Sequence, residues 1–258
     1  MWDDHATVRV TLRGRRYVVK TDQSHGTVAR EAAAYRRAAA AGVRVPHLVA
    51  VTDDALLTTW VDGVTLDQRP TAGAWRDTGA QLRIAHDLSR DPTFGAGFGG
   101  YEPEHPSWRD FFESFAEREL QLCERVLDFP AEHAERIRAA LRMAAPLLDS
   151  PIVGWCHGDF QPEHVLVDPA TNRVASIIDW ADHGSADIGW DVMVLTLDDP
   201  SHLGALLDGY DAEGDLRAAL AERLPLFGVI RLLSEAHWLA EHNLPFENSL
   251  RRAIAWPS

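Results

Sequence analysis

The sequence predicts an α+β fold of two lobes: a small, β-rich N-terminal lobe over residues 1–62 and a larger, mostly helical C-terminal lobe over residues 63–258. Three observations predict this division. The first sixty residues hold four short runs rich in β-branched and aromatic residues, a composition typical of strands. From residue 74 onward, long segments carry apolar residues at helical spacing. Between residues 165 and 178, two further β-rich runs predict one hairpin inside the helical lobe.

The N-terminal lobe is predicted as two strand pairs separated by one helix. The helix spans residues 27–41, which are rich in Ala, Arg and Glu, and Gly42 ends it. A break in the pattern predicts a hinge over residues 59–63, whose backbone groups could read the edge of an adenine ring. The predicted strands cover residues 7–12, 17–20, 46–51 and 55–60.

Composition and charge argue against two classes of partner. The 258 residues carry a formal net charge of −14, whereas nucleic-acid binding depends on Lys and Arg that neutralise phosphates, so we expect no nucleic-acid partner. The acidic surface either serves solubility or lines a pocket for a cationic ligand. No signal peptide or long apolar span is evident, which predicts a cytoplasmic protein with no membrane partner. Cys123 and Cys156 lack metal-site spacing and fit buried thiols of a reducing compartment.

The C-terminal lobe contains one misleading motif. Residues 95–100 match the G-x-G-x-x-G fingerprint, but a helix precedes them and Tyr101-Glu102-Pro103 follows, so they predict a mobile connector and not a phosphate-binding loop. His86 is expected to be a structural histidine, and the aromatic stripe that follows Ser107 is expected to pack in the core. The predicted helices cover residues 74–88, 107–127, 131–148, 209–223 and 226–240.

Polar residues gather around the predicted hairpin. The runs 165–167 and 174–178 are joined by a turn with Pro169 and Asn172, and this hairpin would set Asp159, His164 and Asp179 around one point. One carboxylate before the hairpin and one after it suit phosphoryl transfer from ATP. That reaction needs an Asp to position the acceptor hydroxyl and another to hold Mg²⁺ on the phosphates.

A lysine and a glutamate in the N-terminal lobe strengthen this interpretation. Lys20 ends the second predicted strand, where an isolated lysine would usually only extend its charged head into water. Glu31 lies in the first turns of the next helix and can face that strand. A strand lysine paired with a helix glutamate is how kinases hold the lysine against the α- and β-phosphates.

With Lys20, Glu31, Asp159 and Asp179 in this order, the chain resembles the aminoglycoside phosphotransferase family of small-molecule kinases. The resemblance covers nearly the whole chain and is strongest in HGDFQPEHVLVD and IIDWADHGSADIGWD. It implies a two-lobed protein-kinase-like fold and transfer of the ATP γ-phosphate to a substrate hydroxyl, with GTP as the alternative donor.

The resemblance also implies a role for each residue of the site. Asp159 resembles the catalytic aspartate and Asp179 the principal Mg²⁺ ligand, while Lys20 and Glu31 resemble the phosphate-binding pair. Asp187 is expected to support the catalytic loop and Asp191 to cap the next helix. The remaining candidates are His157 as structural support and the hinge residues Thr59, Trp60 and Val61 as nucleotide contacts.

The sequence departs from the family pattern at two places. The family usually places Asn where this chain has His164, although macrolide phosphotransferases are similar in carrying His there. An imidazole is a softer ligand than an amide oxygen, so we expect His164 to hold the second metal and Mn²⁺ to substitute for Mg²⁺. At the N-terminus, the family's first strand is predicted to be missing, and the loop over the phosphates is reduced to residues 2–5. Either the true start lies upstream, or ATP is held under a shortened loop.

The acceptor is expected to be a small hydroxylated molecule. The segment from Asp179 to Asp191 is too short for the activation segment on which protein kinases bind peptides. Acidic residues of the C-terminal half either form solvated helix faces or bind a cationic acceptor, and the candidates are Asp208, Asp211, Glu235 and Glu241. An antibiotic such as an aminoglycoside or macrolide is the first expectation. The alternatives are a metabolic alcohol of the choline, homoserine or sugar type, and a weakly active pseudokinase that binds nucleotide.

Overall fold

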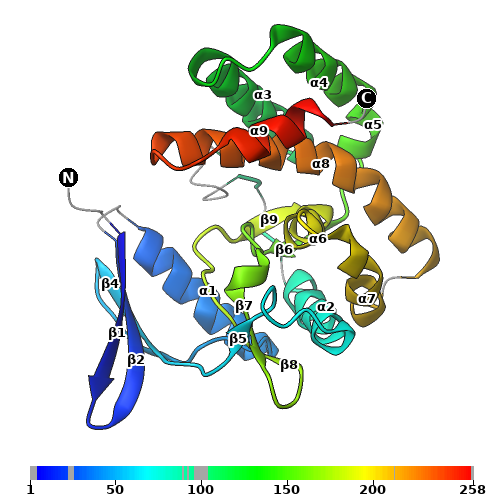
Figure 1. The fold of residues 1–258 in the computed structure, drawn as a ribbon. Coiled ribbons are helices and arrows are strands. Elements are labelled where there is room, and N and C mark those ends of the chain that lie inside the picture. Colours follow the sequence, from blue (N-terminus) through cyan, green and yellow to red (C-terminus); the bar gives the residue numbers. More distant parts are fainter. Residues whose placement is uncertain are drawn as a thin grey trace.

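The computed structural model describes residues 5–22, 26–88, 90–91, 93–95, 104–211 and 213–256. Figure 1 shows the N-terminal sheet and helix α1 together at the lower left, and a larger, mostly helical part above and to the right of them. This arrangement confirms the predicted two-lobed fold. The strands of the N-terminal sheet are β1 (His5–Leu12), β2 (Arg15–Asp22), β3 (Leu48–Val51) and β4 (Ala55–Thr59), in the spatial order β1-β2-β4-β3.

Local sequence explains how this sheet and α1 (Thr27–Ala41) form. Arg13 and Gly14 both have positive φ, as a two-residue turn between twisted antiparallel strands requires, and they join β1 to β2. Gly42 adopts φ 93° and its N–H donates to the last carbonyls of α1, the usual way that glycine ends a helix. The described sheet has four strands, and the predicted reduced loop lies outside the described residues except for His5.

The helical part packs around an aromatic core. Trp108, Phe111, Phe112 and Phe115 of α3 are buried against one another and against Phe227, which confirms the predicted apolar stripe. The helices are α2 (Ala72–His86), α3 (Trp108–Val126), α4 (Ala131–Met143), α5 (Ala145–Leu148), α6 (Gly189–Thr196), α7 (Leu203–Gly209), α8 (Gly214–Glu241) and α9 (Glu247–Ile254). No helix in the described part of the chain is both long and apolar enough to cross a membrane.

Two small sheets lie between the lobes and carry the site. The predicted hairpin is present as β7 (Val165–Asp168) and β8 (Arg173–Ile177), and β5 (Val64–Thr65) adds a third strand next to β7. β6 (Val153–Cys156) pairs antiparallel with β9 (Gly184–Asp187). His157 is the first residue after β6. The short strands β5, β6 and β9 were not predicted, because two to four residues carry little periodic signal.

Three predicted boundaries in the helical part are wrong. The segments 209–223 and 226–240 are not two helices: α7 ends at Gly209, and α8 runs unbroken through Pro225. Burial of α8 against α3, α6 and α9 outweighs the local cost of an internal proline. The predicted helix 131–148 is divided at Ala144, because Pro146 fits only the first turn of a new helix. Residues 96–100 of the predicted connector lie outside the described part, as do residues 101–103, whereas Phe94 and His105 on either side exchange two backbone hydrogen bonds.

Candidate active site

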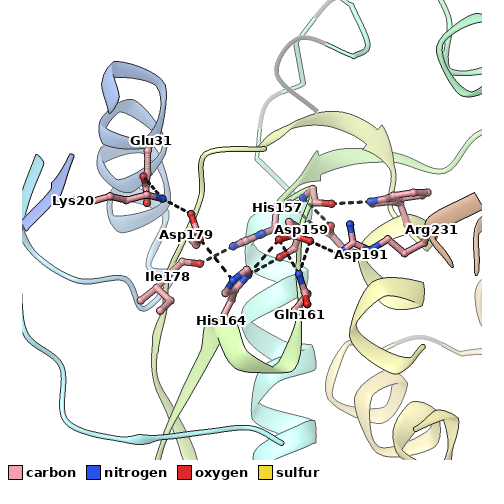
Figure 2. Close-up of polar contacts among 12 residues, drawn as sticks. Lys20, Glu31, His157, Asp159, Gln161, His164, Ile178, Asp179, Asp191 and Arg231 are labelled. Atoms are coloured by element: carbon pink, nitrogen blue, oxygen red, sulfur yellow. Dashed lines mark hydrogen bonds and ion pairs between the residues drawn. The ribbon is translucent and has the colours of Figure 1, made fainter. Parts of the chain in front are cut away.

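Lys20 lies at the centre of a partly buried ion-pair cluster (Figure 2). Its Nζ is 2.9 Å from Glu31 Oε2 and 2.5 Å from Asp179 Oδ1. Burial alone would lower the pKa of Lys20, but the charges of Glu31 and Asp179 outweigh burial and raise it. The lysine therefore stays a cation at neutral pH, as the binding of phosphate groups requires. The predicted pairing of a strand lysine with a helix glutamate is present.

Tyr35 joins this cluster to the backbone of Asp179. It lies one turn after Glu31 on α1, and its hydroxyl donates to Glu31 Oε1 at 3.1 Å. The same hydroxyl accepts the N–H of Asp179 at 3.2 Å. Asp179 has φ 63°, a left-handed conformation that Asp tolerates better than most residues. Tyr35 was not predicted, although its spacing of four residues from Glu31 on a helix was an available signal.

The predicted catalytic loop begins at His157 and is held by Asp191. The Asp191 carboxylate accepts the N–H of His157 at 2.7 Å and that of Gly158 at 3.0 Å, and it lies 3.1 Å from Nε2 of His86. His157 Nε2 in turn contacts the carbonyl of Ile178 at 2.8 Å, and burial lowers the pKa of His157. The loop is thus fixed from α6, α2 and the end of β8.

The predicted roles of Asp187 and Asp191 are reversed. Asp191 does not cap a helix, because it lies inside α6 and supports the catalytic loop. Asp187 is the residue that binds the start of α6, since its carboxylate accepts the N–H of Gly189 at 2.9 Å. It also binds Ile152 N–H and pairs with the Arg223 side chain at 2.7 Å. Both aspartates lie near the start of α6, so the sequence alone does not show which one caps the helix and which one supports the loop. Their tertiary contacts do.

Asp159 has two partners that the sequence did not predict. Gln161 Nε2 lies 2.9 and 3.0 Å from the two carboxylate oxygens, and Arg231 Nη2 of α8 donates to Oδ1 at 2.9 Å (Figure 2). Burial alone would raise the pKa of Asp159, but the charge of Arg231 holds it below its usual value. Asp159 is therefore ionised at neutral pH, the state that a proton acceptor needs.

The carboxyl group of Asp182 lies near this site and was also not predicted. Burial, together with the charges of Asp159 and Asp179, raises the pKa of Asp182 to about 7. The Asp182 backbone packs directly against Gly158, so the segment after Asp179 contacts the catalytic loop.

His164 is oriented by the catalytic loop in a way that suits a metal ligand. Its Nδ1 lies 2.8 Å from the backbone carbonyl of Asp159, and a carbonyl accepts only an N–H, so the proton is on Nδ1. The lone pair is then on Nε2, which lies 3.7 Å from Asp179 Oδ2. A carboxylate oxygen and an imidazole nitrogen at this separation fit one divalent cation between them. These are the two residues predicted to hold metal.

A cavity of about 260 Å³ opens between the lobes next to Lys20 and Asp179. Val18 and Leu56 give it apolar walls on the N-terminal side, and Leu166 and Ile178 do so on the C-terminal side. The predicted hinge residues Thr59, Trp60 and Val61 also line it. The backbone N–H of Trp60 already donates to the Arg16 carbonyl at 3.1 Å, so it is not available to a ligand in this cavity.

The four acidic residues predicted to bind the acceptor do not lie together. Asp208, at the end of α7, pairs with Arg217 at 2.7 Å, and the exposed Asp211 follows it before α8. Glu241 pairs with His237 at 3.2 Å. Glu235 alone lies one helical turn from a residue that contacts Asp159, because it follows Arg231 by four positions on α8.

The comparisons with known proteins decide the family. The model of the phosphotransferase enzyme family matches residues 2–226, which is most of the chain. The chain belongs to this family. The predicted resemblance to aminoglycoside phosphotransferases is confirmed, and the search among curated proteins found no match.

Three solved structures are similar to this phosphotransferase in fold. Choline kinase LicA from Streptococcus pneumoniae is 16% identical, with a TM-score of 0.72 over 96% of this chain and 88% of that one. The gentamicin–APH(2")-IIa complex is 17% identical, with a TM-score of 0.70 over 96% and 86%. A choline/ethanolamine kinase family protein from Mesorhizobium loti is 21% identical, with a TM-score of 0.69 over 97% and 86%. These likenesses confirm the predicted kinase-like fold.

Proposed function

We propose that the protein is an ATP-dependent O-phosphotransferase that moves the γ-phosphate to a hydroxyl of a small molecule. The observation that carries the proposal is the row of polar groups from Lys20 through Asp179 and His164 to Asp159, which starts at the wall of the cavity between the lobes. A pocket with apolar walls beside a buried lysine fits a purine base and its phosphates. An ionised Asp159 at the far end of this row suits a carboxylate that orients the acceptor hydroxyl.

Each residue then has a defined task in the reaction. Lys20, held by Glu31, binds the α- and β-phosphates. Asp159 orients the acceptor hydroxyl and takes its proton. The acceptor oxygen bonds to the γ-phosphorus while the bond from that phosphorus to the bridging oxygen breaks, and ADP leaves. Bound Mg²⁺ would supply charge neutralisation on the phosphates, and Asp179 and His164 would hold it.

A phosphorylation screen read by mass change tests the proposal. The acceptor panel contains aminoglycosides, macrolides and metabolic alcohols, since the solved relatives in fold include both a gentamicin complex and choline kinases. ATP and GTP are compared as donors. We expect a gain of one phosphoryl group on at least one acceptor, dependent on ATP and on a divalent cation. ATP binding without transfer to any acceptor would instead favour a nucleotide-binding pseudokinase.

Metal preference gives a separate prediction for His164. We expect His164→Asn to lower the ratio of Mn²⁺-supported to Mg²⁺-supported activity, because an amide oxygen is a harder ligand than imidazole. We expect His164→Ala to weaken activation by either metal by about tenfold or more, as loss of a ligand or its support usually does. Metal titrations of turnover measure both effects. An unchanged metal preference in both variants would count against His164 as a ligand.

A further inference from the structure

Arg231 contacts the catalytic carboxylate from a part of the chain with no other role in the proposed site. It lies in the second half of α8, its side chain is 20% exposed, and it follows Asp159 by 72 residues. In Figure 2 Arg231 lies on the opposite side of Asp159 from Lys20 and Asp179. It does not line the cavity that the nucleotide would fill.

The geometry of phosphoryl transfer places the acceptor on the Arg231 side. The attacking and leaving oxygens lie roughly in line on opposite sides of the γ-phosphorus. If the nucleotide occupies the cavity beside Lys20, the acceptor hydroxyl approaches Asp159 from the far side, where the guanidinium lies. Any group next to the reacting hydroxyl therefore meets a fixed positive charge.

We propose that Arg231 is a positioning residue for Asp159 and also the charge that selects the acceptor, favouring hydroxyl compounds whose neighbouring groups are neutral or acidic over those with an ammonium group. This inference rests on the proposed function. The inference narrows the class of acceptor. An ammonium group beside the reacting hydroxyl would lie close to the Arg231 guanidinium, which already pairs with Asp159, and the two cations would repel each other. An acidic group would instead gain a second partner in Arg231, whose planar fork suits carboxylate and phosphate.

The other groups around Asp159 do not replace Arg231. Gln161 is neutral, and the Nδ1 proton of His164 is used by the backbone carbonyl of Asp159. His157 is buried with a lowered pKa and contacts the Ile178 carbonyl. Asp179 and Asp182 are acidic groups near the same carboxylate. Without the Arg231 side chain, Gln161 would remain as the side-chain hydrogen-bond donor to the Asp159 carboxylate, so the orientation of that carboxylate should be less fixed.

Three variants in the full-length protein test the inference. Arg231→Met removes the charge, Arg231→Lys keeps it without the fork, and Arg109→Met is the control. Arg109 is a partly exposed arginine of α3 that pairs with Glu113 at 2.8 Å and Asp149 at 2.9 Å. The split of each effect between kcat and KM for the neutral acceptor glucose measures the positioning role. We expect kcat to fall at nearly constant KM in Arg231→Met, to recover in part in Arg231→Lys and to stay unchanged in the control.

Selectivity is measured as kcat/KM for glucose, for glucosamine, which has an amine in place of one hydroxyl, and for glucuronate, which has a carboxylate in place of the CH2OH group. We expect the wild type to prefer glucose or glucuronate. We expect Arg231→Met to shift the glucosamine-to-glucuronate ratio by about tenfold or more towards the amine, the effect of one charge at a partly buried site. Preference for glucosamine in the wild type, or the same ratio in Arg231→Met, would overturn the selective role. An unchanged kcat for glucose in Arg231→Met would overturn the positioning role.

The two proposals fail in different ways. A wild type that phosphorylates no acceptor of any class contradicts the proposed function, and the role of Arg231, which rests on that function, fails with it. A wild type that transfers phosphate normally, with Arg231→Met indistinguishable from it in both measurements, contradicts only the role of Arg231.

Discussion

Replacing Asp159 with Asn is expected to reduce turnover by about 10²- to 10⁴-fold, the usual contribution of a positioned acid or base. Asn has nearly the same shape, and its Oδ1 can still accept the hydrogen bond from Arg231. It cannot take a proton from the acceptor hydroxyl. ATP binding should be unchanged, because Asp159 is not among the residues that line the nucleotide cavity.

Turnover is measured with an acceptor from the screen, and ATP binding by calorimetry on the same preparations. Asp87→Asn is the matched control, since Asp87 also accepts a hydrogen bond from an arginine, Arg83 at 2.8 Å, but is exposed on the end of α2. We expect the control to behave as the wild type. Near-normal turnover in Asp159→Asn would remove Asp159 from its role as proton acceptor.

The sequence predicted those parts of the site that depend on local structure. Asp159, His164 and Asp179 flank a hairpin of short, regular strands, so turn chemistry and strand pattern were enough to bring them together. Lys20 and Glu31 were identified because a strand end and the following helix set a fixed geometry between neighbours in the sequence. The link between this pair and the hairpin residues came from the resemblance to the family, in which Lys20, Glu31, Asp159 and Asp179 have matching positions in the same order. The structure of the intervening chain was not needed for it.

The rest depends on contacts between distant segments. Arg231 meets Asp159 across 72 residues, and no local pattern on α8 separates it from the other arginines there. The path of α8 itself was mispredicted at Pro225, where burial outweighs a local break signal. Asp187 and Asp191 are four residues apart at the same helix start, and capping rules alone assign them in the wrong order.

Replacing Gly158 with Ala is expected to damage both stability and activity. Gly158 has φ +91°, a conformation that costs an L-residue about 1 to 2 kcal/mol. A Cβ there would also overlap the carbonyl oxygen of Asp182 and lie 2.8 Å from the carbonyl carbon, and backbone atoms cannot move aside as a flexible side chain does. Overpacking of this kind adds about 1 to 3 kcal/mol, so the free energy of unfolding should fall by about 2 to 5 kcal/mol.

Gly42→Ala separates the two causes. Gly42 has nearly the same φ, +93°, but a Cβ there would meet nothing within 4 Å, so only the conformational cost of about 1 to 2 kcal/mol remains. Urea unfolding at equal m-value compares the two variants. Any Gly158→Ala protein that folds must displace the Asp182 segment or the loop that carries Asp159. A shift of about 1 Å at a catalytic group costs about a hundredfold in rate, so this variant should lose activity while Gly42→Ala keeps it. If the two alanines were equally mild and both active, the contact between Gly158 and Asp182 would not position the catalytic loop.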